Sequence, residues 1–86
     1  MHELILSAAF QRQVKKLVKQ KPSLKPKLTT TLKHLQKSIR HPSLRLHKLS
    51  GSQNWSVSVT EDLRIILHWE GNQLYCLRIG SHDEVY

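Results

Sequence analysis

The sequence predicts an α+β fold with the element order β-α-α-β-β-β, in which an antiparallel sheet carries an N-terminal helical hairpin on one face. Two patterns support this prediction. Apolar residues recur every three to four positions through residues 1–40, as in amphipathic helices, whereas from Leu44 onward they recur every second position, as in strands. A hydrophobic fraction of 38% with only 3 Gly and 3 Pro is typical of a folded chain, and a length of 86 residues predicts one domain spanning residues 1–86.

The first half should form a short strand at His2–Leu6 and then two helices. Ser7 is placed to cap the first helix, because its hydroxyl can accept a backbone N–H of the first turn, and Pro22 ends that helix. The second helix is expected from Ser23 to about Arg40, where His41-Pro42 follows. The apolar stripes of the two helices are Phe10, Val14, Leu17 and Val18, and Leu28, Leu32, Leu35 and Ile39. Both stripes need an apolar partner, which the second half supplies.

The second half is expected to form the sheet. Leu44–Leu49 can form a strand, and the polar residues 50–54 make a turn. Trp55–Thr60 alternates apolar and hydroxyl-bearing residues, which predicts a half-exposed strand. Leu63–Trp69 is a nearly continuous apolar run, bounded by turns at residues 61–62 and 71–72.

The last predicted strand, Leu74–Ile79, is apolar on both alternating sets of positions apart from Arg78. This pattern predicts a central strand covered on both faces, after which Gly80 allows a turn or bulge. A polar tip follows the strand and contains His82, Asp83, Glu84 and Tyr86. We expect a function at this tip, because a buried strand would hold it rigidly.

Charge is distributed unevenly along the chain, whose formal net charge is +8. Residues 1–50 hold 12 of the 14 Lys and Arg residues and one acid, for a net charge of +11, whereas residues 51–86 have a net charge of −3. This excess favours a polyanionic partner, either a nucleic acid or an acidic protein segment. No apolar run is long enough to span a membrane, and the single cysteine, Cys76, is expected to be buried; a cytoplasmic location is therefore the default.

Several ionisable residues of the sheet half are candidates for chemistry. One concave sheet face could gather His47, Arg64, Arg78, His82 and Tyr86 from neighbouring strands. Two imidazoles and a guanidinium meet the needs of metal-free RNA cleavage: one group takes the 2′-OH proton, one returns a proton to the leaving 5′-oxygen, and the cation stabilises the phosphorane.

These residues also have structural interpretations. His47 can be an ordinary surface histidine, and Arg64 and Arg78 can form ion pairs with Asp62, Asp83 or Glu84. His68 is expected to cap a strand at the sheet edge. Trp55 and Trp69 are interpreted as core residues rather than stacking platforms, and no ligand spacing suggests a zinc site, so neither a metal nor a cofactor is expected.

The segments LRLHKLSGSQNWSVSV, DLRIILHW and LRIGSHDEVY resemble the RelE/ParE superfamily of bacterial type II toxins, as do the preceding strand and basic helices. The ending IGSHDEVY is most similar to RelE- and YafQ-type mRNA interferases, which are ribosome-dependent endoribonucleases. The resemblance implies that His82 is catalytic, that Tyr86 engages an RNA base, and that His47, Asp62 and Arg64 match further active-site positions. The residues expected to bind RNA are Lys15, Lys16, Lys19, Lys33, Lys37, Lys48 and Arg78.

The resemblance has one departure, on the strand Trp55–Thr60. RelE carries two lysines where this chain has Ser56 and Ser58, and YafQ-like members carry a histidine at the position of Ser58. The alternatives are therefore a ParE-like protein that inhibits DNA gyrase without chemistry, and a degenerate toxin that acts only as a corepressor. The resemblance also implies partners: a cognate acidic antitoxin in a hetero-oligomer, and the ribosome with its mRNA.

Overall fold

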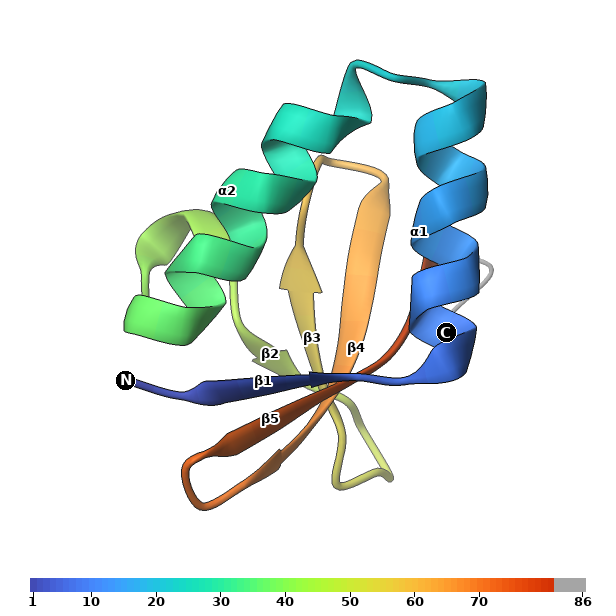
Figure 1. The fold of residues 1–86 in the computed structure, drawn as a ribbon. Coiled ribbons are helices and arrows are strands. Elements are labelled where there is room, and N and C mark those ends of the chain that lie inside the picture. Colours follow the sequence, from blue (N-terminus) through green and yellow to red (C-terminus); the bar gives the residue numbers. More distant parts are fainter. Residues whose placement is uncertain (82–86) are drawn as a thin grey trace.

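The fold is known from a computed structural model, which describes residues 1–81. The elements follow in the order β1 (Glu3–Leu6), α1 (Ala8–Gln20), α2 (Leu24–Lys37), the 3₁₀ helix η1 (Pro42–Leu44), β2 (His47–Lys48), β3 (Trp55–Ser58), β4 (Leu63–Glu70) and β5 (Gln73–Ser81). Figure 1 shows both helices on one side of the sheet. The predicted α+β class and the placement of the helices are confirmed.

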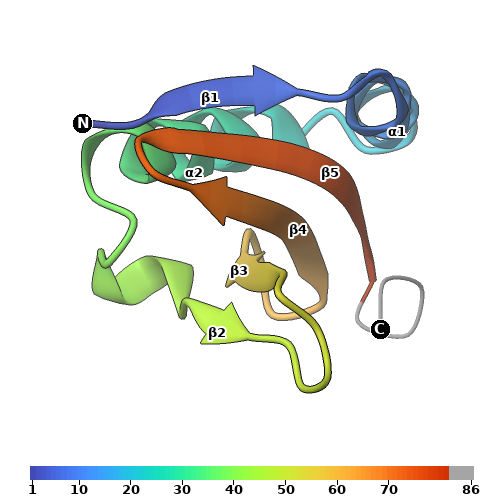
Figure 2. The same ribbon diagram turned by 90° about the horizontal axis from the view of Figure 1, so that it is seen from below.

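The sheet has five strands in the order β1-β5-β4-β3-β2. The pairs among β2, β3, β4 and β5 are antiparallel, as predicted, whereas β1 runs parallel to β5, with Glu3 opposite Gln73 and Leu6 opposite Cys76. Four strands follow the helices, one more than the order β-α-α-β-β-β contains. The short strand β2, at one edge of the sheet, lies within the predicted strand Leu44–Leu49. Figure 2 shows β1 and β2 at opposite ends of the curved sheet.

The core lies between the helices and one face of the sheet. Phe10 from α1 and Leu28 and Leu35 from α2 are buried against Val57, Ile65, Leu67, Leu74 and Ile79 from β3, β4 and β5. Ser7 caps α1 as predicted, since its hydroxyl oxygen accepts a hydrogen bond from the backbone N–H of Phe10 at 3.0 Å. Ser23 precedes α2 but makes no side-chain capping bond.

Two predicted boundaries differ from the structure. Helix α2 ends at Lys37 rather than near Arg40, although Ile39 is still buried in the core. The segment 44–49 is mostly not a strand: it begins within η1, and Arg45 adopts a left-handed conformation with φ 48°. That conformation turns the chain away from the extended path, so that only His47–Lys48 pairs with β3.

The sequence predicted Leu74–Ile79 as a central strand, and β5 does lie inside the sheet, between β1 and β4, but the middle strand of the five is β4. Ile65, Ile66 and Leu67 are all fully buried, so β4 is covered on both faces. In β5, a bulge leaves Leu77 without an opposite residue, since Ile66 pairs with Arg78 and Leu67 with Cys76. The bulge exchanges the two faces of the strand, which explains the apolar residues on both alternating sets of positions. Gly80, where the sequence predicted a turn or bulge, is a paired residue inside β5.

Candidate active site

The face of the sheet that the helices leave uncovered carries the candidate site. Four residues lie directly opposite one another across β2, β3, β4 and β5: His47, Ser56, Ile66 and Arg78. Residues paired in this way share a face, and their neighbours Val57, Ile65 and Ile79 point into the core on the other face. His47 and Arg78 are exposed, whereas Ser56 and Ile66 between them are fully buried.

A second row on the same face contains Ser58, Arg64 and Gly80. Ser58 is only 8% exposed, and its Oγ is buried without a hydrogen-bond partner. The Nε of Arg64, directly opposite, is also buried without a partner. Buried polar groups are nearly always hydrogen-bonded in proteins, so two unpaired N–H and O–H donors on facing residues are an unusual feature. Each of the two donors is therefore a candidate for a hydrogen bond to a ligand.

The face of β3 that carries Ser56 and Ser58 is buried, whereas the sequence predicted it to be exposed. Within residues 1–81, Arg64 makes no ion pair with Asp62, so the structural interpretation of Arg64 as that carboxylate's partner fails. Asp62 itself is an exposed residue of the turn between β3 and β4.

The structure brings together only part of the predicted site. His47, Arg64 and Arg78 share the helix-free face, and Asp62 lies at its border, two residues before Arg64. His82 and Tyr86, like Asp83 and Glu84, lie outside the described residues. In the sequence, Ser58 stands out only as a departure from the family pattern. Its position directly opposite Arg64 depends on strand register, which the sequence alone does not provide.

The predicted RNA-binding lysines lie elsewhere. All are exposed: Lys15, Lys16 and Lys19 on α1, Lys33 and Lys37 on α2, and Lys48 on β2. Figure 1 shows α1 and α2, which carry five of these lysines, on one side of the sheet. Lys16 also lines a pocket with Ile79 and Gly80 of β5. Arg78 is the one predicted RNA-binding residue on the candidate catalytic face.

Helix α1 holds the bulged part of β5. The Ser7 hydroxyl donates a hydrogen bond to the carbonyl oxygen of Leu77 at 2.9 Å. The backbone N–H of Ser7 donates a second bond, to the carbonyl oxygen of Cys76, at 3.1 Å. The Gln13 Oε1 accepts a hydrogen bond from the backbone N–H of Ile79 at 2.8 Å. These bonds replace the strand partner that β5 loses where β1 ends, and they fix the segment that places Arg78 on the helix-free face.

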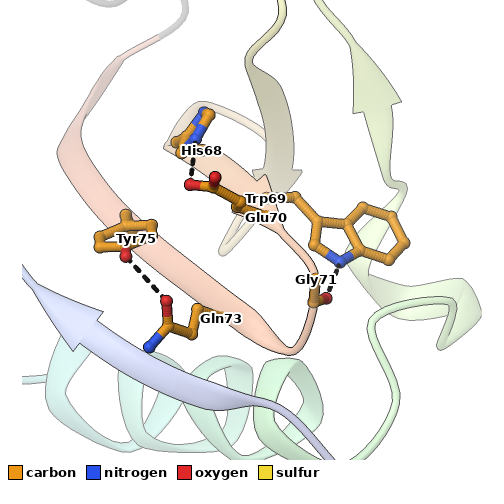
Figure 3. Close-up of polar contacts among 6 residues, drawn as sticks. All are labelled: His68, Trp69, Glu70, Gly71, Gln73 and Tyr75. Carbon is orange, nitrogen blue, oxygen red and sulfur yellow. Dashed lines mark hydrogen bonds and ion pairs between the residues drawn. The ribbon is translucent and has the colours of Figure 1, made fainter.

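The other end of the helix-free face is occupied by a small polar cluster, shown in Figure 3. His68 Nε2 lies 3.4 Å from Glu70 Oε2, and the Tyr75 hydroxyl donates to Gln73 Oε1 at 2.8 Å. His68 is paired with Tyr75 inside the sheet, so its prediction as a cap at the sheet edge is wrong. This cluster is already hydrogen-bonded, in contrast to Ser58 and Arg64.

Two other features complete the chemistry of the described residues. Cys76 is buried as predicted, and burial raises the pKa of its thiol to about 12, so it does not act as a nucleophile at neutral pH. A pocket of about 290 Å³ between α2, η1 and β3 is lined by Lys27, His34, Ser43 and Ser58, among others. The His34 ring stacks on His41 there, with centroids 3.8 Å apart.

Comparison with known proteins was made by sequence and by structure. No family model and no curated protein matches the sequence. Among solved structures, a metal-bound toxin from Helicobacter pylori is 26% identical over 100% of both chains, with a TM-score of 0.82. YafQ of E. coli, solved in its complex with DinJ, is 21% identical over 100% of this chain and 99% of its own, with a TM-score of 0.83.

A third solved structure widens the comparison. A YoeB/ParE toxin from Agrobacterium tumefaciens matches 95% of this chain and 99% of its own at 14% identity, with a TM-score of 0.78. This chain has the fold of the RelE/ParE toxins. The resemblance predicted from the sequence is thus confirmed at the level of the fold.

Residues 1–81 contain neither a cluster of metal-binding side chains nor a membrane-spanning helix. The H. pylori toxin is described as metal-bound. In residues 1–81 of this protein, no three His, Cys, Asp or Glu side chains are grouped so that they could hold a metal ion. Neither helix in the same range is long and apolar enough to cross a membrane.

Proposed function

We propose that this protein is the toxin of a type II toxin–antitoxin system and acts as a metal-independent endoribonuclease that cleaves mRNA on the ribosome. The observation that carries the proposal is the unpaired pair of donors, Ser58 Oγ and Arg64 Nε, on the same sheet face as His47 and Arg78. A non-bridging phosphate oxygen is a ligand that would accept from both.

The proposed chemistry is attack by the 2′-oxygen of a nucleotide on the adjacent phosphorus, with cleavage of the bond to the 5′-oxygen. His47 and His82 divide the two proton transfers, one taking the 2′-OH proton and one giving a proton to the leaving 5′-oxygen. Arg64 stabilises the negative charge that develops on the phosphorane, and Ser58 donates a hydrogen bond to the same group. Asp62 and Tyr86 complete the site as the family resemblance implies, with Tyr86 against the RNA base.

The test is a purified translation system in which the 5′ ends of mRNA are mapped with and without the protein. We expect new ends only when ribosomes are present. His47→Ala should lower the rate about 10²–10⁴-fold. Arg64→Ala should lower it about 10²–10³-fold. Circular dichroism must show that both variants are folded, and unchanged cleavage by either variant would contradict the assignment.

A second candidate function is ParE-like inhibition of DNA gyrase. It is favoured by Ser56 and Ser58, which stand where related nucleases carry proton-handling residues. A supercoiling assay with purified gyrase separates the two: inhibition of gyrase without mRNA cleavage would replace the nuclease proposal.

The basic surfaces of the helices are proposed to bind ribosomal RNA. Neutralising each phosphate should contribute a log–log salt slope of about −0.9 in a duplex or −0.7 in a single strand. Lys→Gln substitution at positions 15, 16, 19, 33 and 37 should therefore flatten the salt dependence of ribosome binding without changing the cleavage site. An unchanged slope would show that these lysines do not contact RNA.

An antitoxin is proposed as the physiological partner, because YafQ has been solved in complex with DinJ. We expect an acidic segment that folds across this protein on binding, given the net charge of +11 in residues 1–50. Co-expression with each neighbouring open reading frame should restore growth and yield a hetero-oligomer. If neither open reading frame restores growth or co-purifies with the protein, the result contradicts the toxin proposal.

A further inference from the structure

Both tryptophans of the chain lie together at one end of the sheet. Trp55 on β3 and Trp69 on β4 meet edge to face, with ring centroids 5.5 Å apart. The Lys48 Nζ lies 5.7 Å from the centroid of the Trp55 ring, and the Arg40 Cζ lies 5.8 Å from that of Trp69. These four residues form a continuous series, Arg40–Trp69–Trp55–Lys48, which we call the tryptophan ladder.

The ladder is on the opposite face of the sheet from the candidate active site. Lys48 pairs with Trp55, and Trp55 pairs with Leu67, a residue of the core face. Trp69, two residues beyond Leu67, points the same way, and Figure 3 shows its indole projecting away from Glu70. The Glu70 carboxylate, next to Trp69 in the sequence, therefore lies on the other face of the sheet from the cations and rings of the ladder.

Trp55 and Trp69 pack against the core, as predicted, but this structural role leaves part of the ladder unexplained. Both indoles are only partly buried, and Arg40 and Lys48 are exposed. Trp69 uses its ring N–H in a bond to the carbonyl oxygen of Gly71 at 3.1 Å, which fixes the ring. The one ion pair among residues 1–81 joins His68 to Glu70, so no described carboxylate neutralises Arg40 or Lys48. The cations are held over the rings but keep their charge available to a ligand.

We propose that the tryptophan ladder binds single-stranded RNA. A base stacks on the guanidinium and indole of Arg40 and Trp69, and Lys48 binds a neighbouring phosphate. Cations alone would also attract an acidic peptide, but a nucleic acid brings both the negative charge and the flat π-system that stacks on aromatic rings and guanidinium groups. The choice of RNA rests on the proposed function, and the ladder extends that function by giving the substrate a second contact remote from Arg64.

The test uses tryptophan fluorescence, because the two tryptophans of the protein are both in the ladder. The probe is a single-stranded 2′-O-methyl octanucleotide, which cannot be cleaved because its 2′-oxygens are blocked. We expect saturable quenching, with weaker or no quenching by an abasic oligonucleotide of the same length. Arg40→Gln should weaken binding about tenfold, as expected for the loss of one stacked base.

A matched control is Lys21→Gln, which removes the same charge from an exposed residue just after α1 that is not among the proposed RNA-binding lysines; it should leave the quenching amplitude unchanged. Equal quenching by the abasic oligonucleotide or by a decaglutamate peptide would overturn the proposal. It would also be overturned if fluorescence anisotropy of a labelled octanucleotide showed binding without any quenching. Because the probe cannot be cut, absence of nuclease activity in the translation assay would leave this result intact, so the two proposals fail separately.

Discussion

The two faces of the sheet differ in whether the side chains that they bury are apolar or carry unpaired polar atoms. The face under α1 and α2 is filled with side chains such as Val57, Ile65 and Leu67, which are fully buried and have no polar groups to satisfy. The helix-free face also buries residues, but they include Ser58 and Arg64, whose polar atoms remain without partners. Burial on the first face stabilises the fold, whereas burial of these unpaired polar atoms on the second face opposes it.

This difference indicates where stability and function are separated. An unpaired buried donor costs about 1–3 kcal/mol, and a sequence selected only for stability would replace it by an apolar residue. The covered face should therefore respond to substitution mainly through the free energy of unfolding, and the helix-free face mainly through activity. Four experiments test this division.

The largest effect is expected on the covered face. Leu35 of α2 is fully buried in the core, so Leu35→Ala should lower the free energy of unfolding by about 2–5 kcal/mol through lost burial and a residual cavity. Chemical denaturation measures this change. The exposed neighbour Lys33 provides the control, since Lys33→Ala should alter stability by less than about 0.5 kcal/mol.

Arg64→Met tests the helix-free face. Removal of the unpaired Nε should leave the free energy of unfolding within about 1 kcal/mol of the parent value, or raise it. mRNA cleavage should fall about 10²–10³-fold, because the phosphorane loses its cation. Denaturation and cleavage are measured on the same preparation. A loss of more than about 2 kcal/mol in the free energy of unfolding would show that Arg64 stabilises the fold. The proposed difference between the two faces of the sheet would then be wrong.

Cys76 adds a pH dependence to the covered face. Its thiol has a pKa of about 12 in the folded protein because of burial, against about 9 when unfolded. Between these values the unfolded chain releases the thiol proton and the folded protein keeps it. Stability should thus fall as pH rises from about 9 to 12, by up to about 1.4 kcal/mol per pH unit. Cys76→Val should show a shallower decline, and identical slopes for parent and variant would contradict the assignment.

The smallest effect concerns two helix caps with different contacts. Ser7→Ala removes the bond from the Phe10 N–H and the bond to the Leu77 carbonyl, so it should cost about 1 kcal/mol. Ser23→Ala should cost less than about 0.5 kcal/mol, because Ser23 makes no capping bond. Thermal unfolding of both variants measures the difference. Equal losses would indicate that the contact with the bulge in β5 contributes nothing.

Much of the fold could be predicted because its signals are local. The period of apolar residues located both helices, and Ser7 marked the start of the first. The bulge at Leu77 could not be predicted, since an apolar run on both sets of positions also fits a strand covered on both faces. The strand order, with β1 parallel to β5, depends on contacts between residues about 70 positions apart, such as Glu3 and Gln73. No local sequence pattern encodes such contacts.

The candidate site was predictable in its residue types but not in its geometry. His47, Arg64 and Arg78 were singled out because ionisable residues interrupted or bordered apolar strands. The importance of Ser58 could not be read in the same way, because a serine in an alternating strand looks like an ordinary exposed hydroxyl. Only the register that places it opposite Arg64, and the burial of both polar atoms, distinguishes it.

The pairing of β1 with β5 also has a consequence for the synthesis of the protein. Glu3 lies opposite Gln73, so β1 can pair with β5 only after 70 further residues have been synthesised. The two helices emerge in the meantime with their apolar stripes uncovered, because Ile65, Leu67, Leu74 and Ile79 are made later. Such long-range closure is typical of slow folding. The sheet, including the face that bears Arg64, therefore assembles late in the synthesis of each chain.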